Sequence, residues 1–170
     1  MAITTGKDTT EVLLGAPETS GGYCFKLPMG TDFPDTADTA PDPAAIDQGY
    51  LSEDGVEVKT DAGTDKIRDW DKAPIALIQK SNDCSITLEF VQVSAAVART
   101  MFGDANVEVD ATTGKVKAIH YTGDLLSHFG WLFRMRDANG PYVLAAFDGM
   151  VTGMSGFKLA KGEVVSFKAE

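Results

Sequence analysis

The chain has 170 residues, 44% of them hydrophobic, which suits one ordinary domain with a sizeable core. Lys and Arg total 15 against 25 Asp and Glu, so the net charge is −10 and the field repels phosphate groups. This balance argues against a protein that grips nucleic acid. No long apolar run and no basic leader followed by an apolar stretch is present, so we expect neither a membrane span nor a signal peptide.

The first third of the chain is expected to contain little regular structure. Residues 1–14 are polar and threonine-rich and predict an N-terminal arm that ends in a short strand. The stretch "GYCFKLP", residues 22–28, predicts a strand. Residues 30–71 predict a long acidic and proline-rich loop region, because "TDFPDTADTAPDPAAID" lacks apolar periodicity and has too little apolar surface to order itself.

The second half of that loop region also contains short β-forming runs. These are "GYLS", "GVEVKT" and "KIRDW", separated by the turn signals Glu53-Asp54-Gly55 and Asp61-Ala62-Gly63. Between Asp32 and Asp71 the chain has twelve acidic and three basic residues, so its acidity is concentrated there. The sequence predicts short strands joined by turns inside an acidic excursion.

Beyond Pro74 the sequence predicts longer strands. "PIALIQK" is followed by "CSITLEFVQV", in which polar and apolar residues alternate, as in a strand with one wet face. The polar members are Ser85, Thr87 and Glu89, and the apolar members are Ile86, Leu88 and Phe90.

The one predicted helix spans residues 94–103. Ser94 is its expected N-cap, Val97, Met101 and Phe102 form an apolar stripe, and Gly103 ends it. Further strand-like runs continue to the C-terminus. We therefore expect a mainly β fold over residues 1–170, an antiparallel sandwich or barrel with one flanking helix, a long extended loop and terminal arms.

A search for chemistry finds no catalytic residue, metal site or cofactor motif. An isolated pair, His120 and His128, cannot supply the three or four ligands that zinc requires. Phosphate loops, a nucleophile elbow and a regular calcium loop are all missing from the sequence. Cys24 and Cys84 are expected to be reduced thiols, and Trp131 to be an anchor of the core or of an interface. The residues themselves indicate an acidic β-rich domain that is not an enzyme.

Several stretches, taken in order, resemble the major tail protein, or tail tube protein, of long-tailed, siphovirus-type bacteriophages. Their sequence most resembles that of phages that infect actinobacteria. The stretches are "LGAPETSGGYCFKLPMGTDFP", then "GYLSEDGVEVKTDAGTDKIRDWD", then "SITLEFVQVSAAVARTMFG". The middle block with the "TLEF" strand and the helix that follows is the most specific part, and the resemblance runs over nearly the whole chain.

This resemblance implies a virion protein that is synthesised and assembled in the host cytoplasm. It implies self-assembly into stacked, hexameric rings around a lumen, with the tape measure protein inside and the tail terminator and distal tail proteins at the tube ends. Double-stranded DNA would pass through the lumen without specific binding, and no membrane would be involved. An acidic lumen wall would keep phosphate groups from sticking.

The resemblance also suggests roles for residues that have no other evident use. We expect Ser85, Thr87 and Glu89 to face the lumen, and Trp70 to anchor a neighbouring subunit. The loop region would become ordered on the adjacent ring, and the C-terminal stretch "KGEVVSFKAE" is a candidate strand between subunits. The candidates for contacts between rings or between subunits are Asp35, Asp38, Asp42, Tyr50, Glu53, Asp54 and Trp70.

Two alternatives remain open at this stage. One is the tube of a related tail-like particle. The other is a monomeric calcium- or carbohydrate-binding β-sandwich, in which the acidic loops and Trp70 would form the site.

Overall fold

The computed structural model describes residues 13–18, 22–157 and 160–170. Strands make up 44% of the structure and helix 7%, and every strand pair in these ranges is antiparallel. The prediction of a mainly β, antiparallel fold with one α-helix is therefore confirmed. The part of the predicted N-terminal arm that precedes Leu13 lies outside the described residues.

Sheet A contains four strands in the order β10, β9, β1, β2. The predicted strand at residues 22–28 is present as β1, which ends just before Pro28, a residue without an N–H for a ladder bond. Residues 13–18 run beside β9 beyond the start of β1 and make one bridge, between Pro17 and Met135. The bounds are Cys24–Leu27 (β1), Ile46–Asp47 (β2), Phe129–Asp137 (β9) and Gly140–Gly149 (β10).

Sheet B also has four strands, in the order β11, β12, β6, β3. Because β12 pairs with β11 on one side and β6 on the other, the C-terminal strand is already used inside the subunit. The expectation that it adds to a neighbouring subunit is therefore wrong. The bounds are Leu51–Asp61 (β3), Asp83–Phe90 (β6), Met154–Ser155 (β11) and Phe167–Ala169 (β12).

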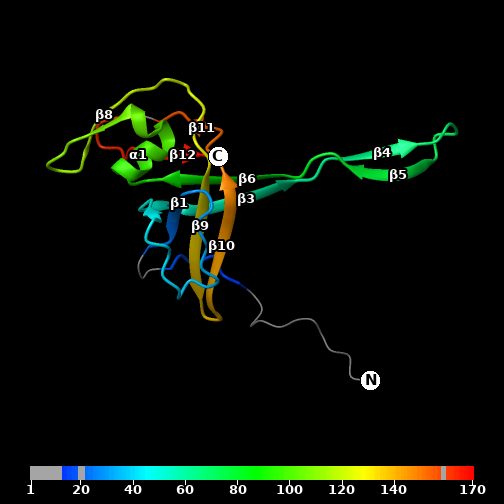
Figure 1. Ribbon diagram of the computed structural model, residues 1–170, viewed down its shortest axis with the longest axis horizontal. Coiled ribbons are helices and arrows are strands. Elements are labelled where there is room, and N and C mark those ends of the chain that lie inside the picture. Colours follow the sequence, from blue (N-terminus) through cyan, green and yellow to red (C-terminus); the bar gives the residue numbers. More distant parts are fainter. Residues whose placement is uncertain (1–12, 19–21, 158–159) are drawn as a thin grey trace.

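The two sheets pack face to face, and their strands run across one another (Figure 1). Trp131 and Phe133 of β9 share the main core with Leu88 and Phe90 of β6 and with Phe167 of β12. The alternation predicted for β6 is confirmed, because its apolar members point into this core while Ser85, Thr87 and Glu89 stay partly exposed. The architecture is a β-sandwich.

The helix α1, Ala95–Phe102, closes one end of the core. Its first turn is capped by the Ser94 hydroxyl, which accepts the Val97 N–H at 3.2 Å, and Gly103 ends it with a φ of 88° that favours glycine. A two-stranded hairpin, β7 (Val107–Val109) and β8 (Val116–Ile119), packs beside it, after a short 3₁₀ turn at Asp104–Asn106. No helix in the described part of the chain has the length and hydrophobicity of a membrane span.

A long two-stranded arm extends from sheet B, away from the sandwich (Figure 1). Strands β3 and β6 continue into a second hairpin made of β4 (Thr64–Arg68) and β5 (Pro74–Gln79). We call residues 64–79 the distal arm. All sixteen residues are solvent-exposed, so none of the other residues that the structure describes packs on this hairpin.

The structure corrects the predicted strand boundaries in residues 30–71. From Leu51 onward the chain is not a loop but strand β3 of sheet B, which continues into the arm, and "GYLS" and "GVEVKT" meet in this single strand. The expected turn at Glu53-Asp54-Gly55 is a bulge between Leu51 and Val56, where Gly55 adopts a φ of 71°. The glycine of such a bulge produces the same local signal as a turn, so the sequence pattern does not separate them.

Residues 28–45 cover the outer face of sheet A, and we call them the cover segment. Phe33 and Ala45 pack on Phe25 and Leu132 of the sheet, and Ala37 is 0% exposed. The ring of Phe33 lies so close to Gly130 that a Cβ there would come within 2.6 Å of it. The expectation that this tract cannot bury enough surface to order itself is therefore wrong.

Candidate assembly surfaces

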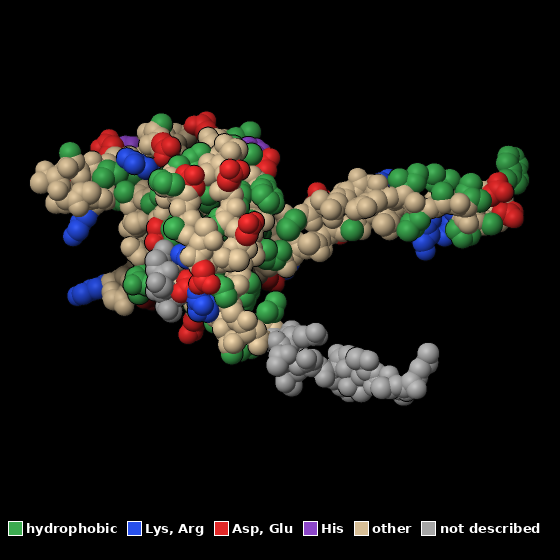
Figure 2. All heavy atoms as spheres, turned by 60° about the horizontal axis from the view of Figure 1, so that its bottom comes forward, with side chains coloured by type: hydrophobic (Ala, Val, Ile, Leu, Met, Phe, Trp, Pro, Cys, Tyr) green, Lys and Arg blue, Asp and Glu red, His purple; other side chains and the backbone are tan. Residues whose placement is uncertain are grey.

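The distal arm presents apolar side chains on both of its faces. The register pairs Ile67 with Ala76, so these two lie with Ile78 on one face, while Ile75 and Leu77 lie on the other. Figure 2 shows hydrophobic side chains along much of the arm, with acidic groups gathered near its far end. A strand that is apolar on both faces is normally buried on both faces, whereas the apolar side chains on both faces of β5 are exposed.

The outer face of sheet B is polar and accessible. Its strand register places Thr87 opposite Glu57, Ser85 opposite Lys59, and Glu89 opposite Lys168. Lys59 and Glu57 form an exposed ion pair at 3.3 Å, and Glu89 accepts a hydrogen bond from Ser166. The charges of two carboxylates and two ammonium groups therefore cancel at the centre of this face.

An acidic bias on that face begins only toward the root of the arm. There Asp61 and Asp83 face each other across β3 and β6. The predicted acidic wall is therefore not a property of the whole face that carries Ser85, Thr87 and Glu89.

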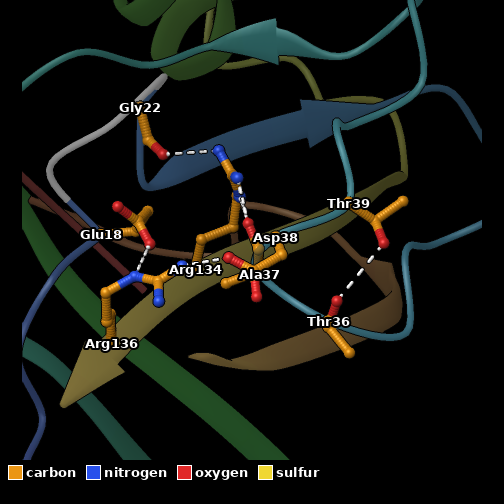
Figure 3. Close-up of polar contacts among 8 residues, drawn as sticks. All are labelled: Glu18, Gly22, Thr36, Ala37, Asp38, Thr39, Arg134 and Arg136. Atoms are coloured by element: carbon orange, nitrogen blue, oxygen red, sulfur yellow. Dashed lines mark hydrogen bonds and ion pairs between the residues drawn. The ribbon is translucent and has the colours of Figure 1, made fainter. Parts of the chain in front are cut away.

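Two arginines of β9 hold the cover segment against sheet A (Figure 3). Arg134 is buried and donates to the carbonyl oxygens of Ala37, from Nε at 3.1 Å, and of Gly22, from Nη1 at 3.2 Å. Arg136 bonds Glu18 at 2.5 Å and also the carboxylate of Asp38. These bonds, the one to Glu18 first, raise the pKa of Arg136 above its usual value. The cover segment is thus fixed by polar contacts as well as by apolar packing.

The predicted contact residues lie in three separate places. Asp35, Asp38 and Asp42 lie on the cover segment, where Asp38 pairs with Arg136 and Asp42 accepts the Ala44 N–H at 2.7 Å. Trp70 lies far away, at the tip of the distal arm. Tyr50, Glu53 and Asp54 are exposed at and beside the start of β3. Asp38 and Asp42 therefore have intramolecular roles, and no single patch unites the whole set.

No arrangement suited to catalysis or metal binding emerges among the described residues. His120 contacts Glu108 at 3.3 Å and His128 contacts Asp148 at 2.6 Å, both as exposed pairs on the surface. Groups of three or more potential metal ligands are absent from the described ranges. Both thiols are free, and burial raises the pKa of Cys24, which disfavours its reactive thiolate form.

Sequence reasoning missed the apolar residues of β5 as a surface. "PIALIQK" was expected as an ordinary sheet strand, whereas Ile75, Leu77 and Ile78 are exposed to solvent. The available signal was the unbroken apolar run beside an acidic turn that contains Trp70. Such a run predicts two covered faces without saying whether the same chain covers them.

Comparison with known families adds independent evidence. The model of a phage tail tube protein family matches residues 7–168, nearly the full length of the chain. A search of curated proteins finds no match. The match includes both sheets, the helix and the whole arm. On this evidence the chain belongs to the phage tail tube protein family.

Proposed function

We propose that this protein assembles with copies of itself into stacked rings, six subunits to a ring, that form the tube of a siphovirus-type tail. The lumen would hold the tape measure protein before infection and conduct double-stranded DNA during ejection. Tail terminator and distal tail proteins would close the two ends. The subunit acts as structure rather than as an enzyme, and phage particles assembled in the host cytoplasm would carry it in their tails.

The distal arm is the observation that carries this proposal. It exposes Ile67, Ile75, Leu77 and Ile78 on two faces, together with Trp70 at its tip. Exposed apolar surface on a long flat hairpin invites association, and a subunit that polymerises has a use for it. Neighbouring subunits would cover both faces, so the apolar surface is buried only in the assembled tube.

The free sheet edges support lateral contacts within a ring. Among the described strands, β10 is an edge of sheet A and β3 an edge of sheet B, so each leaves one row of backbone N–H and C=O groups that no described strand pairs with. Pairing of the β10 edge of one subunit with the β3 edge of the next is a heterologous contact, and it closes into a ring when the rotation permits.

The lumen wall is best supplied by sheet B. The outer face of sheet A is covered by residues 28–45, whereas that of sheet B is polar and accessible at Ser85, Thr87 and Glu89. In this arrangement balanced charges, with carboxylates near the arm root, would give DNA phosphates no net attraction.

Assembly of the purified protein tests the proposal. Size-exclusion chromatography and negative-stain microscopy should show rings or tubes with a central hole in the wild-type protein. A protein that stays monomeric at high concentration, and gains thermal stability with calcium or a glycan, would contradict it. Microscopy of whole phage with an antibody against this chain would place it along the tail.

A charge change tests the lumen assignment separately. Glu89→Lys adds positive charge to the outer face of sheet B and should permit assembly while slowing DNA ejection. Ala44→Lys, on the exposed surface of the cover segment, is the matched control and should leave ejection unchanged. Equal ejection by both variants would show that sheet B does not line the lumen, while the tube proposal would stand.

A further inference from the structure

The turn at the end of the distal arm has an ordered backbone and presents the Trp70 side chain to solvent. The Trp70 side chain is 99% exposed, while the backbone N–H of Trp70 donates to the Asp69 carboxylate at 2.7 Å and that of Ala73 donates to the Asp71 carboxylate at 3.0 Å. Lys72 adopts a φ of 68°, a left-handed conformation that is uncommon for a residue with a side chain. The backbone of the turn is therefore ordered, with the indole exposed, before any partner is present.

A second feature with matching chemistry lies beside β8. A groove of about 850 Å³ runs between β8, the start of α1 and the C-terminal segment, and we call it the β8 groove. Lys115 and Lys117, both exposed, lie along the β8 side. The apolar residues that line it include Val93, Ala95, Val116, Ile119, Phe157 and Val165. An apolar groove beside two ammonium groups suits an aromatic side chain flanked by carboxylates, as Trp70 is by Asp69 and Asp71.

The arm and the groove lie at opposite ends of the molecule. Figure 1 shows the distal arm at one extreme of the longest axis and α1 with β8 at the other. The arm of a copy therefore cannot reach its own groove. When identical subunits stack with one polarity along this longest axis, however, the end that bears the arm meets the opposite end of the next copy.

We propose that the Trp70 turn of one subunit docks in the β8 groove of a subunit in the next ring, with Asp69 and Asp71 facing Lys115 and Lys117. This inference rests on the proposed tube and names its axial contact. The aromatic ring fills the groove as the anchor of the interface, and the charges fix its orientation. Because donor and acceptor are different surfaces, the contact repeats without closing and lengthens the tube.

Photo-crosslinking tests which surface receives the turn. A photoreactive phenylalanine analogue replaces Trp70, and this variant is co-assembled with excess wild-type protein. Crosslinks to residues 93–95 or 114–119 of another copy are expected. The same analogue at Leu125, which is 89% exposed but outside the groove, is the control and should not label those residues.

Charge reversal provides a second measurement. Lys117→Glu should leave thermal unfolding of the monomer unchanged and raise the critical concentration for assembly roughly tenfold, the cost of about 1.4 kcal/mol at an interface. Lys161→Glu, at an exposed lysine outside the groove lining, is the control and should leave the critical concentration unchanged. If the mixed tubes form but the analogue at position 70 crosslinks to other surfaces, or to none, the axial contact alone would be overturned. A wild-type protein that never assembles would overturn the proposed function and this inference with it.

Discussion

The cover segment is packed and the distal arm is exposed, which is the reverse of what their compositions predict. Residues 28–45 are rich in Asp, Thr, Ala and Pro, yet they pack against sheet A with Ala37 fully buried. The distal arm contains "PIALI", a run typical of a buried strand, yet all of its residues are exposed. The contrast teaches that one segment completes the subunit and the other is left incomplete, so that a further copy can complete it.

The largest effect should come from a leucine beneath the cover segment, compared with a leucine of the distal arm. Leu132→Ala empties space under the cover segment, where Leu132 is 0% exposed, and should lower the free energy of unfolding by about 2–5 kcal/mol. Leu77→Ala, at a residue 63% exposed on the distal arm, should change it by less than about 0.5 kcal/mol and impair assembly instead. Urea unfolding of the monomers measures both. Equal losses would show that the arm is packed within the monomer.

A smaller loss is expected from Arg134→Met. The variant keeps much of the side chain but leaves the Ala37 and Gly22 carbonyls without their donor, at a cost of about 2–3 kcal/mol. Native-state proteolysis should then cut the cover segment faster, while the rate of cutting in the distal arm stays unchanged. Arg99→Met, at an exposed arginine of α1, is the control. A protease-resistant Arg134→Met protein would show that apolar packing alone holds the cover segment.

The elements that could be predicted are those whose signals are local. Alternation along β6 predicted its buried face, and Ser94 and Gly103 predicted the limits of α1. The cover segment could not be predicted, because its anchor Arg134 lies 97 residues from Ala37. The path of the arm depends likewise on how β3 pairs with β6, which no local pattern states. The roles of Trp70 and of the sheet B face stay predictions, since a single subunit lacks the neighbours that define them.

Labelling of the two cysteines tests the same contrast between sheet A and the arm without a mutation that destabilises the protein. Cys84 is exposed at the root of the arm, whereas Cys24 is buried in β1 and burial raises its pKa. A thiol reagent at neutral pH should label Cys84 in the native monomer and reach Cys24 only after unfolding. Mass spectrometry of the labelled peptides measures this, with Cys84→Ser as the control. Rapid labelling of native Cys24 would mean that sheet A opens.

The smallest effect concerns pH and the strand-like segment beside β9. Asp137 accepts the N–H of Leu14 at 3.0 Å and that of Asn139 at 2.7 Å, and these bonds hold its pKa below the ordinary 3.8. Because the folded pKa is lowered, the stabilisation is present above pH 3.8 and disappears as the pH falls through the lower folded value.

An NMR titration of the Asp137 carboxyl measures this directly. Its midpoint should lie below 3.8 in the wild-type protein. Leu14→Pro removes the N–H that contributes most and should move the midpoint upward, whereas Leu14→Ala keeps that N–H and should not. A wild-type midpoint that Leu14→Pro leaves unchanged would mean that residues 13–18 leave β9 in solution, so that sheet A, like the arm, would expose a surface that the subunit itself does not cover.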